Sequence, residues 1–560
     1  MSTTHFPPAT RRRRATPADT LPPPTPTPTS AEPDRRYLGA LGAAVELGIG
    51  VRAYHVLSHD FPLNAGGLFF SMVRDLQAAH YRLPAFTSYN DAAIPYGYSP
   101  LGFYLAGLLD DWTPLTLVDV FRWLPLVASA LIVVVFADLA RRLLISRTAV
   151  VAAVLSFALL PRSFIWMLMG GGLTRSLGFL FALLTVRLLH SFYTTRQWRY
   201  APLASLAAAA TVLSHLGTAP FVAISGLLFL IAYGRHRRAV LGSAAAALGT
   251  LALTAPWWLS VIAMHGPGPF LAASATGGTI FRSLSLQDLA STFALLGLGT
   301  AESLLAVIGM LGALGFFYSL TMRDWLLPAW WIAIVTLDAR QGSSFATVPI
   351  ALLAGVAVAH LLLPAMRGLG VRTLRGNPPR AGWSPEVVLG LFAVFAAVSA
   401  VLHTPVAGGL NDMGPLTANE RAALRWTASH TPANARLLIV SGTPWEIDRT
   451  SEWLPALTGR KSVATVQGFE WRPIGQFARK KREYIELQGC AGWVSQCLRD
   501  WSRATGQSYT HVYIPKSPDR DCCRVLLHSL QRDRSFRLVY DGPGAAVFAR
   551  RATRTLAARP

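Results

Sequence analysis

Apolar runs of roughly 20 residues follow one another along most of the chain, and short polar segments separate them. A helix of that length crosses the hydrocarbon core of a bilayer, so each run predicts a transmembrane helix. We expect about eleven such helices, to within one or two, because the fifth, sixth and ninth runs are short. The runs lie near residues 37–57, 118–140, 148–168, 173–193, 200–217, 219–234, 240–263, 302–321, 324–338, 343–364 and 385–403.

The composition agrees with a membrane class. Hydrophobic residues make up 52% of the chain and charged residues 14%, whereas a soluble domain carries about 25% charged residues. One acid, Glu46, falls in the middle of the first run. A charge inside hydrocarbon is costly, so we expect Glu46 to have a partner inside the helix bundle. The predicted fold class is a polytopic α-helical membrane protein.

The arginines between the runs indicate how the chain is oriented. With the N-terminus in the cytoplasm, the basic connections all fall on the cytoplasmic side, as the positive-inside rule requires. An odd number of spans then leaves everything after about residue 404 outside. We expect the inner membrane of a bacterium. The arginines concerned are Arg141, Arg142, Arg147, Arg196, Arg199, Arg235, Arg237, Arg238, Arg323, Arg367, Arg372, Arg375 and Arg380.

The net charge of +22 needs no nucleic-acid partner, because the arginines lie where topology and anionic lipid favour them. Residues 1–34 are rich in arginine and then in proline, which predicts a disordered cytoplasmic tail. The membrane domain is then expected over residues 35–403. It includes a large first external loop, residues 58–118.

The sequence pattern over residues 404–552 predicts a soluble α/β domain on the extracytoplasmic side of the membrane. A capping box, Thr417 to Glu420, precedes a helical run over 421–430. A second helical stretch covers 523–531. Short runs rich in β-branched and aromatic residues predict strands near 437–440, 511–514, 536–540 and 545–548.

All four cysteines fall in this predicted external domain, which fits an oxidising compartment and disulfide bonds. Three pairings are open, and a zinc site is a weaker alternative because no histidine lies close in the sequence. Bonds from Cys490 and Cys497 to Cys522 and Cys523 are favoured over a bond between the two neighbours, which would be strained.

Ionisable residues gather in the first loop and at the outer ends of the predicted spans. Arginine forks bind phosphate, and a carboxylate or histidine can deprotonate a hydroxyl, so the set suits an anionic lipid substrate. Asp60 and His215 are the catalytic candidates. The substrate-binding candidates are Arg74, Arg175, His265, Glu302, Asp338 and Arg340. The plainer alternative is that such side chains only anchor helices at the headgroups.

The arrangement of the chain resembles the glycosyltransferase-C superfamily, which includes protein O-mannosyltransferases, aminoarabinose transferases and oligosaccharyltransferases. The resemblance rests on the long first loop, the number of spans and the external C-terminal domain. Local matches are Ser71–Leu76, Gly170–Arg175, Ser214–His215 and Glu452–Arg460. The resemblance implies transfer of a sugar from a polyprenyl-phosphate carrier to a glycan, lipid or protein acceptor in the cell envelope.

One position departs from the family pattern. Counted back from Arg74 and Asp75, the acid that serves such enzymes as catalytic base falls on Ala65. Alanine is neither a base nor a metal ligand, so Asp60, Glu302 or Asp338 would have to take the role. No cofactor is required by the sequence, and use of a divalent cation stays open. Two alternatives remain: an inactive relative that binds lipid or glycan, and a transporter or flippase, although no inverted repeat is visible.

Overall fold

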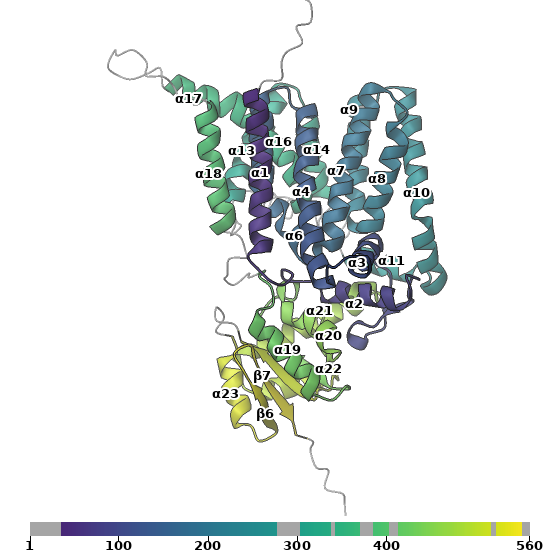
Figure 1. Cartoon of the computed structure of the whole chain (residues 1–560), viewed down its shortest axis with the longest axis vertical. Coiled ribbons are helices and arrows are strands. Elements are labelled where there is room, and N and C mark those ends of the chain that lie inside the picture. The colour runs from purple at the N-terminus through teal and green to yellow at the C-terminus, as the bar shows by residue number, and fades with distance from the viewer. Residues whose placement is uncertain are drawn as a thin grey trace, which may run out of the picture.

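A computed structural model describes residues 35–276, 303–337, 342–369, 385–402, 413–516 and 522–551. The expected tail over residues 1–34 lies outside these ranges. Long helices form an upright bundle, and the C-terminal α/β domain lies against one end of it (Figure 1). The first loop lies between the two.

The bundle is built from helices that match the predicted spans. Among the described residues, six helices are long and apolar enough to cross a membrane by length and composition, and five shorter apolar helices match the remaining runs. Exposed leucines such as Leu248 and Leu251 cover the outer face of the bundle, as a lipid-facing surface requires. The chain is a polytopic helical membrane protein. The helices are α1 (Arg35–Leu57), α4 (Leu117–Leu143), α5 (Arg147–Leu159), α7 (Gly172–Thr195), α8 (Tyr200–Ser214), α9 (Ala219–Tyr233), α10 (Arg237–His265), α13 (Ser303–Thr321), α14 (Leu326–Leu337), α16 (Thr347–Ala357) and α18 (Pro385–Leu402).

The third predicted span is interrupted. Helix α5 ends at Leu159, and a 3-10 turn (Pro161–Ser163) and the short helix α6 (Ile165–Leu168) follow. Proline lacks the backbone N–H that would continue the helix and restricts the residue before it, so the helix ends there.

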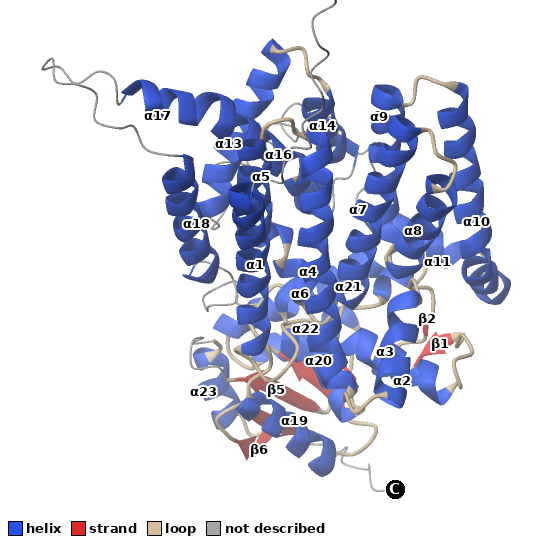
Figure 2. Cartoon of the chain, turned by 45° about the horizontal axis from the view of Figure 1, so that its top comes forward, coloured by secondary structure: helices blue, strands red, loops and turns tan. Residues whose placement is uncertain are grey.

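The C-terminal domain has a five-stranded sheet in the order β4-β3-β5-β7-β6, drawn in red in Figure 2. Strand β3 pairs in parallel with β4 and β5, while β7 pairs antiparallel with β5 and β6. The four predicted strands are confirmed, and the capping box of Thr417 and Glu420 starts the predicted helix. The elements are α19 (Ala418–His430), β3 (Arg436–Ile439), α20 (Arg449–Thr458), β4 (Lys461–Ser462), α21 (Gln476–Gly489), α22 (Gln496–Thr505), β5 (His511–Pro515), α23 (Arg524–Arg532), β6 (Phe536–Asp541) and β7 (Ala545–Arg550).

The predicted cysteine pairing is wrong. Cys490 bonds to Cys497, and Cys522 bonds to its neighbour Cys523. The turn after α21 brings the first pair to a Cα–Cα distance of 5.7 Å, within the range a disulfide spans. Cys523 adopts a left-handed conformation (φ 70°) at the start of α23.

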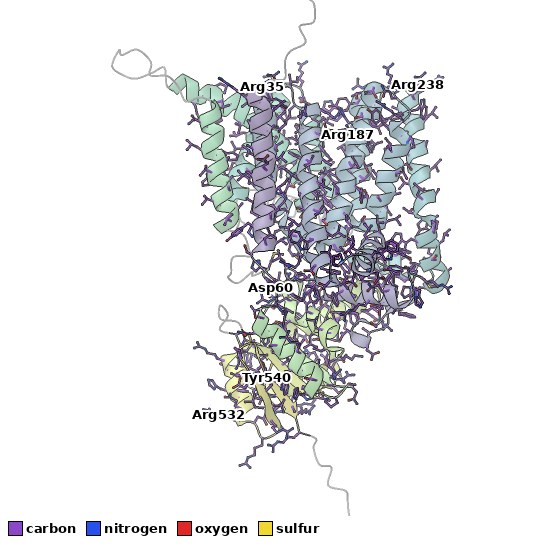
Figure 3. The ribbon with its side chains drawn as sticks, viewed as in Figure 1. Arg35, Asp60, Arg187, Arg238, Arg532 and Tyr540 are labelled. Carbon is purple, nitrogen blue, oxygen red and sulfur yellow. A yellow bond between two sulfur atoms is a disulfide. The ribbon has the colours of Figure 1, made fainter. Side chains whose placement is uncertain are left out.

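Basic side chains mark the end of the bundle opposite the C-terminal domain. Arg35 and Arg238 lie at that far end, whereas Asp60 lies where the bundle meets the domain (Figure 3). The orientation of these two ends relative to the membrane stays a prediction from the arginine pattern.

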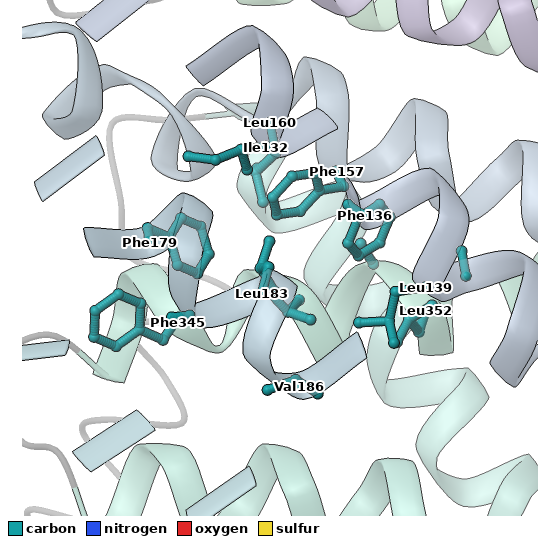
Figure 4. Close-up of a cluster of buried hydrophobic side chains, with 14 of the residues drawn as sticks. Ile132, Phe136, Leu139, Phe157, Leu160, Phe179, Leu183, Val186, Phe345 and Leu352 are labelled. Atoms are coloured by element: carbon teal, nitrogen blue, oxygen red, sulfur yellow. The ribbon is translucent and has the colours of Figure 1, made fainter. Parts of the chain in front are cut away.

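The bundle interior is tightly packed. The rings of Phe136 and Phe157 stack with their centroids 4.1 Å apart, within the apolar cluster of Figure 4. A fully buried arginine, Arg52, donates to Ser129 Oγ (3.1 Å), Gly48 O (2.9 Å) and Ser163 Oγ. The expected interior partner for Glu46 is wrong, because that side chain is exposed on the outer face of α1.

The first loop is a folded unit rather than an open excursion. It contains α2 (Gly67–Ala78), the short strands β1 (Phe86–Thr87) and β2 (Ile94–Pro95), and α3 (Leu101–Trp112). Its buried side chains share one hydrophobic cluster with the C-terminal domain: Phe70 and Tyr96 lie in the same core as Trp453 and Tyr513. The loop and the domain are therefore packed against each other as one body.

Candidate active site

The segment from Pro62 to Gly67 is held between two other parts of the chain. On one side, Gly170 N–H donates to Leu63 O (3.0 Å) and Gly171 N–H donates to Ala65 O (3.2 Å). A side chain on Gly170 would collide with the carbonyl of Ala65. The glycine run at 170–172 thus allows the close backbone approach that its sequence suggested.

On the other side lies α20 of the C-terminal domain. The backbone N–H of Gly66 donates to Glu452 Oε1 at 2.9 Å. Trp453 Nε1 donates to Asn64 O (2.7 Å), and Tyr89 Oη donates to the backbone carbonyl of Glu452 (2.7 Å). A carboxylate from the C-terminal domain therefore lies beside Ala65, at the N-terminus of α2, where a helix favours negative charge.

The environment of Glu452 changes its acidity. Burial raises the pKa of this carboxyl to about 7, and the charge of Glu470 also raises it. The backbone N–H groups of Gly66 and Leu68 and the charge of Arg175 act in the opposite direction. A carboxylate with a pKa near neutrality suits general base catalysis.

Arg175 lies in the first turn of α7, directly after the glycine run. It is half-buried, with its guanidinium over the ring of Trp166 at 5.6 Å from the centroid. The positive charge of Arg175 lowers the pKa of Glu452, by less than burial raises it. An arginine and a carboxylate together offer a phosphate-binding group and a proton acceptor.

Asp60 is placed differently. Its carboxylate forms a two-pronged ion pair with Arg421 of α19, with Nη1 to Oδ1 at 3.0 Å, and its side chain is 72% exposed. The hydrogen bond from Arg421 lowers the pKa of Asp60. The pair joins the start of the first loop to the C-terminal domain at the surface.

Three further predicted site residues, His215, His265 and Arg74, lie at the same end of the bundle, each with its own partners. His215 Nδ1 lies 2.9 Å from Thr218 Oγ1, at the end of α8. His265 Nε2 lies 2.7 Å from Ala85 O and packs edge-on against Phe86. Arg74 is exposed and stacks on Phe70 at 4.4 Å.

Glu302, Asp338 and Arg340 lie outside the described residues, so their places as candidates stay predictions. Within the described part of the chain, histidines, cysteines and acids form no group of three or more that could hold a metal ion.

In the sequence, Glu452 stands out only as part of the segment Glu452–Arg460, which resembles a family motif, and no catalytic role was predicted for it. The contact of Glu452 with Gly66 joins residues 386 positions apart. The available signal was an acid next to a tryptophan in a segment that resembles a family motif.

Three solved structures share this fold at low sequence identity. The archaeal oligosaccharyltransferase AglB from Archaeoglobus fulgidus, in complex with an inhibitory peptide and a dolichol-phosphate, is 14% identical with a TM-score of 0.52; the match covers 86% of this chain and 69% of that one. ArnT from Cupriavidus metallidurans, bound to undecaprenyl phosphate, is 15% identical with a TM-score of 0.51, covering 91% of this chain and 98% of that one.

The third is the arabinofuranosyltransferase AftD from Mycobacteria, 17% identical with a TM-score of 0.50. The match covers 94% of this chain and 40% of that one. No protein-family model and no curated protein matches the chain. The fold is thus that of the glycosyltransferase-C enzymes, as the sequence resemblance predicted.

Proposed function

We propose that this protein is a membrane glycosyltransferase that moves a sugar from a polyprenyl-phosphate-linked donor to an acceptor at the outer face of a bacterial inner membrane. The fold likeness supports the reaction class, since AglB and ArnT were solved with lipid phosphates. The observation that carries the proposal is the carboxylate of Glu452 beside Ala65, with Arg175 close enough to act on its charge.

In this reaction Glu452 accepts the proton of the acceptor hydroxyl. The hydroxyl oxygen then bonds to the anomeric carbon of the sugar, and the bond from that carbon to the phosphate oxygen breaks. The electron pair leaves with the polyprenyl phosphate, whose growing negative charge Arg175 stabilises. Holding donor and acceptor in one geometry supplies much of the remaining rate.

The assignment of Asp60 as base stays a prediction, and its surroundings favour Glu452. An exposed carboxylate with a lowered pKa, already bound by Arg421, is a weak proton acceptor. His215 is kept as a candidate at the same end of the bundle, with the orientation that Thr218 gives its ring. Arg74, Arg175 and His265 remain the donor-binding candidates.

Purified full-length protein in lipid nanodiscs tests the proposal with a panel of radiolabelled polyprenyl-phosphate monosaccharides. The expected result is saturable binding of at least one donor, transfer of its sugar, and weaker donor binding in Arg175→Gln. A protein that binds such donors without ever transferring the sugar would be an inactive relative. Movement of intact donor across the membrane of sealed proteoliposomes, without transfer, would identify a flippase.

A further inference from the structure

A cavity of about 420 Å³ lies where the C-terminal domain meets the first loop, a size typical of sites for small ligands. The first loop contributes Asn90 to Ala93, and the C-terminal domain contributes the opposite walls. Five basic side chains line it: Arg436, Lys461, Arg472, Arg479 and Lys480. The acids in the lining are Asp91 and Glu483, so the cavity carries a net positive charge.

The two acids do not neutralise the whole cavity. Glu483 pairs with Lys480 (3.2 Å) and lies 3.7 Å from Arg479. Asp91 is 94% exposed and lies 3.5 Å from Lys461, an arrangement that water screens strongly.

The two remaining guanidiniums are fixed by neutral oxygens. Arg472 donates from Nη1 to Ala92 O (3.0 Å) and Ala93 O, and from Nε to Gln476 Oε1. Arg436 donates from Nε to Ser508 O at 2.8 Å. Within the described residues neither guanidinium forms an ion pair, so neutral acceptors fix their orientation and no acid neutralises their charge. Preorganised guanidiniums of this kind bind carboxylate or phosphate.

Hydrogen bonds connect the wall of this cavity to the helix that carries Glu452. Asn90 and Ser462 exchange two hydrogen bonds (3.0 and 2.7 Å). Thr465 Oγ1 lies 2.6 Å from Ser462 Oγ and 2.9 Å from the carbonyl oxygen of Ser451, the residue before Glu452. The lining residue Ser462 is therefore linked through Thr465 to α20.

We propose that this basic cavity binds an anionic group of the acceptor glycan, either a uronate carboxylate or a phosphate substituent. The inference rests on the proposed function and adds the chemical class of the acceptor. A concave, oriented set of arginines at the domain junction fits a small charged saccharide, whose hydroxyls the amide of Gln507 and other polar side chains of the lining can meet.

The test is a binding measurement that needs no turnover. Full-length protein in zwitterionic nanodiscs is titrated with an oligogalacturonate, a phosphorylated oligosaccharide and a neutral oligosaccharide of equal length. We expect at least one of the two charged probes to bind about tenfold more tightly than the neutral one, as a charge-assisted contact implies.

Two matched variants locate the binding. Arg479→Glu reverses a charge in the cavity, and Arg503→Glu reverses one on α22 outside it. The two side chains are similarly exposed, at 67% and 72%, and each has an acidic partner one turn away. We expect Arg479→Glu to weaken binding of the charged probe about tenfold or more, and Arg503→Glu to leave it within about twofold. Arg436→Gln is expected to weaken it as well.

Equal binding of the neutral and charged probes, or equal losses in the two charge reversals, would overturn the inference. Loss of charged-probe binding by the wild type in nanodiscs that contain anionic lipid, with the neutral probe unaffected, would assign the cavity to a lipid headgroup instead. Glu452→Gln is expected to bind the probe normally, because probe binding does not need the proposed base. Absence of probe binding would therefore count against the cavity proposal and not against the proposed transfer reaction. Binding without transfer by the wild type would instead count against the proposed function alone.

Discussion

Two carboxylates connect the first loop to the C-terminal domain, and they are built differently. Asp60 is exposed, holds a guanidinium and has a lowered pKa. Glu452 is buried, accepts backbone N–H groups and has a pKa raised to about 7. An ion pair in water fixes position at little energetic cost or gain, whereas a buried acid near neutral pKa is expensive to keep and suits proton transfer.

Asp60 is the acid closer to Ala65 in the sequence, whereas Glu452 is the acid that contacts the backbone beside Ala65 in the structure. Asp60 was the obvious substitute for the missing acid because it precedes Ala65 by five positions. Glu452 comes from the other end of the chain but is the acid that reaches the loop backbone beside Ala65. In the proposed function, an acid from the C-terminal domain thus takes the role that the family resemblance assigns to the position of Ala65.

The largest expected effect comes from Glu452→Gln. The glutamine Oε1 still accepts the Gly66 N–H, so the fold is kept while the base is removed. We expect transfer to fall by about 100-fold or more, the usual contribution of a general base, with a melting temperature that is not lowered. Initial rates with a saturating lipid-linked donor measure the effect. A variant with near wild-type rates would remove Glu452 from the mechanism.

A second change asks whether the acid can be returned to its familial place. In Glu452→Gln, the added substitution Ala65→Asp puts a carboxylate on the first loop beside Gly171, which has no side chain and lies next to Ala65 Cβ. We expect it to recover about tenfold of the lost rate. The matched control adds Ser58→Asp, an exposed position on the same loop, and should recover none. Equal recovery in both would mean that added charge, and not position, restores activity.

The packing of α20 on α2 can be loosened without touching either carboxylate. A side chain on Gly67 would collide with the backbone carbonyl of Glu452, whereas one on Gly489 meets no atom within 4 Å. Gly67→Ala is expected to lower the free energy of unfolding by about 1–3 kcal/mol, as overpacking does, and to slow transfer. Thermal unfolding in detergent compares the stability of Gly67→Ala with that of the control variant Gly489→Ala. Equal stability of the two variants would contradict the close packing of α20 on α2.

The pH dependence should report Glu452. Transfer needs the ionised base, so kcat/KM is expected to rise as pH increases through about 7. Because the pKa of Glu452 in the folded protein lies above the ordinary glutamate value of 4.5, its contribution to stability is present below pH 4.5 and is lost as pH rises to about 7. Glu452→Gln should remove that stability change. A profile that is flat across neutral pH would exclude Glu452 as the titrating group.

The smallest effect is expected for Asp60→Asn. Loss of an exposed ion pair with Arg421 should cost at most about 1 kcal/mol of stability and change transfer by no more than about threefold. The same assays measure both quantities. A loss as large as that of Glu452→Gln would return the catalytic role to Asp60.

Local patterns were enough to predict the spans and four strands of the C-terminal sheet. Apolar length located the spans, and runs of β-branched and aromatic residues located the strands, since both depend on neighbouring residues. The short elements of the first loop, such as α2, carry no such pattern, and the break at Pro161 was missed because the hydrophobic run continues across the proline. The cysteine pairing and the place of Glu452 depend on contacts set by tertiary packing.

The most direct test of the central claim is an electron cryo-microscopy structure of Glu452→Gln with a polyprenyl-phosphate sugar bound. The account predicts the donor phosphate on Arg175 and the anomeric carbon facing residue 452, with space between them for one acceptor hydroxyl. A donor bound with its sugar facing Asp60, and residue 452 still buried and far from the sugar, would contradict it.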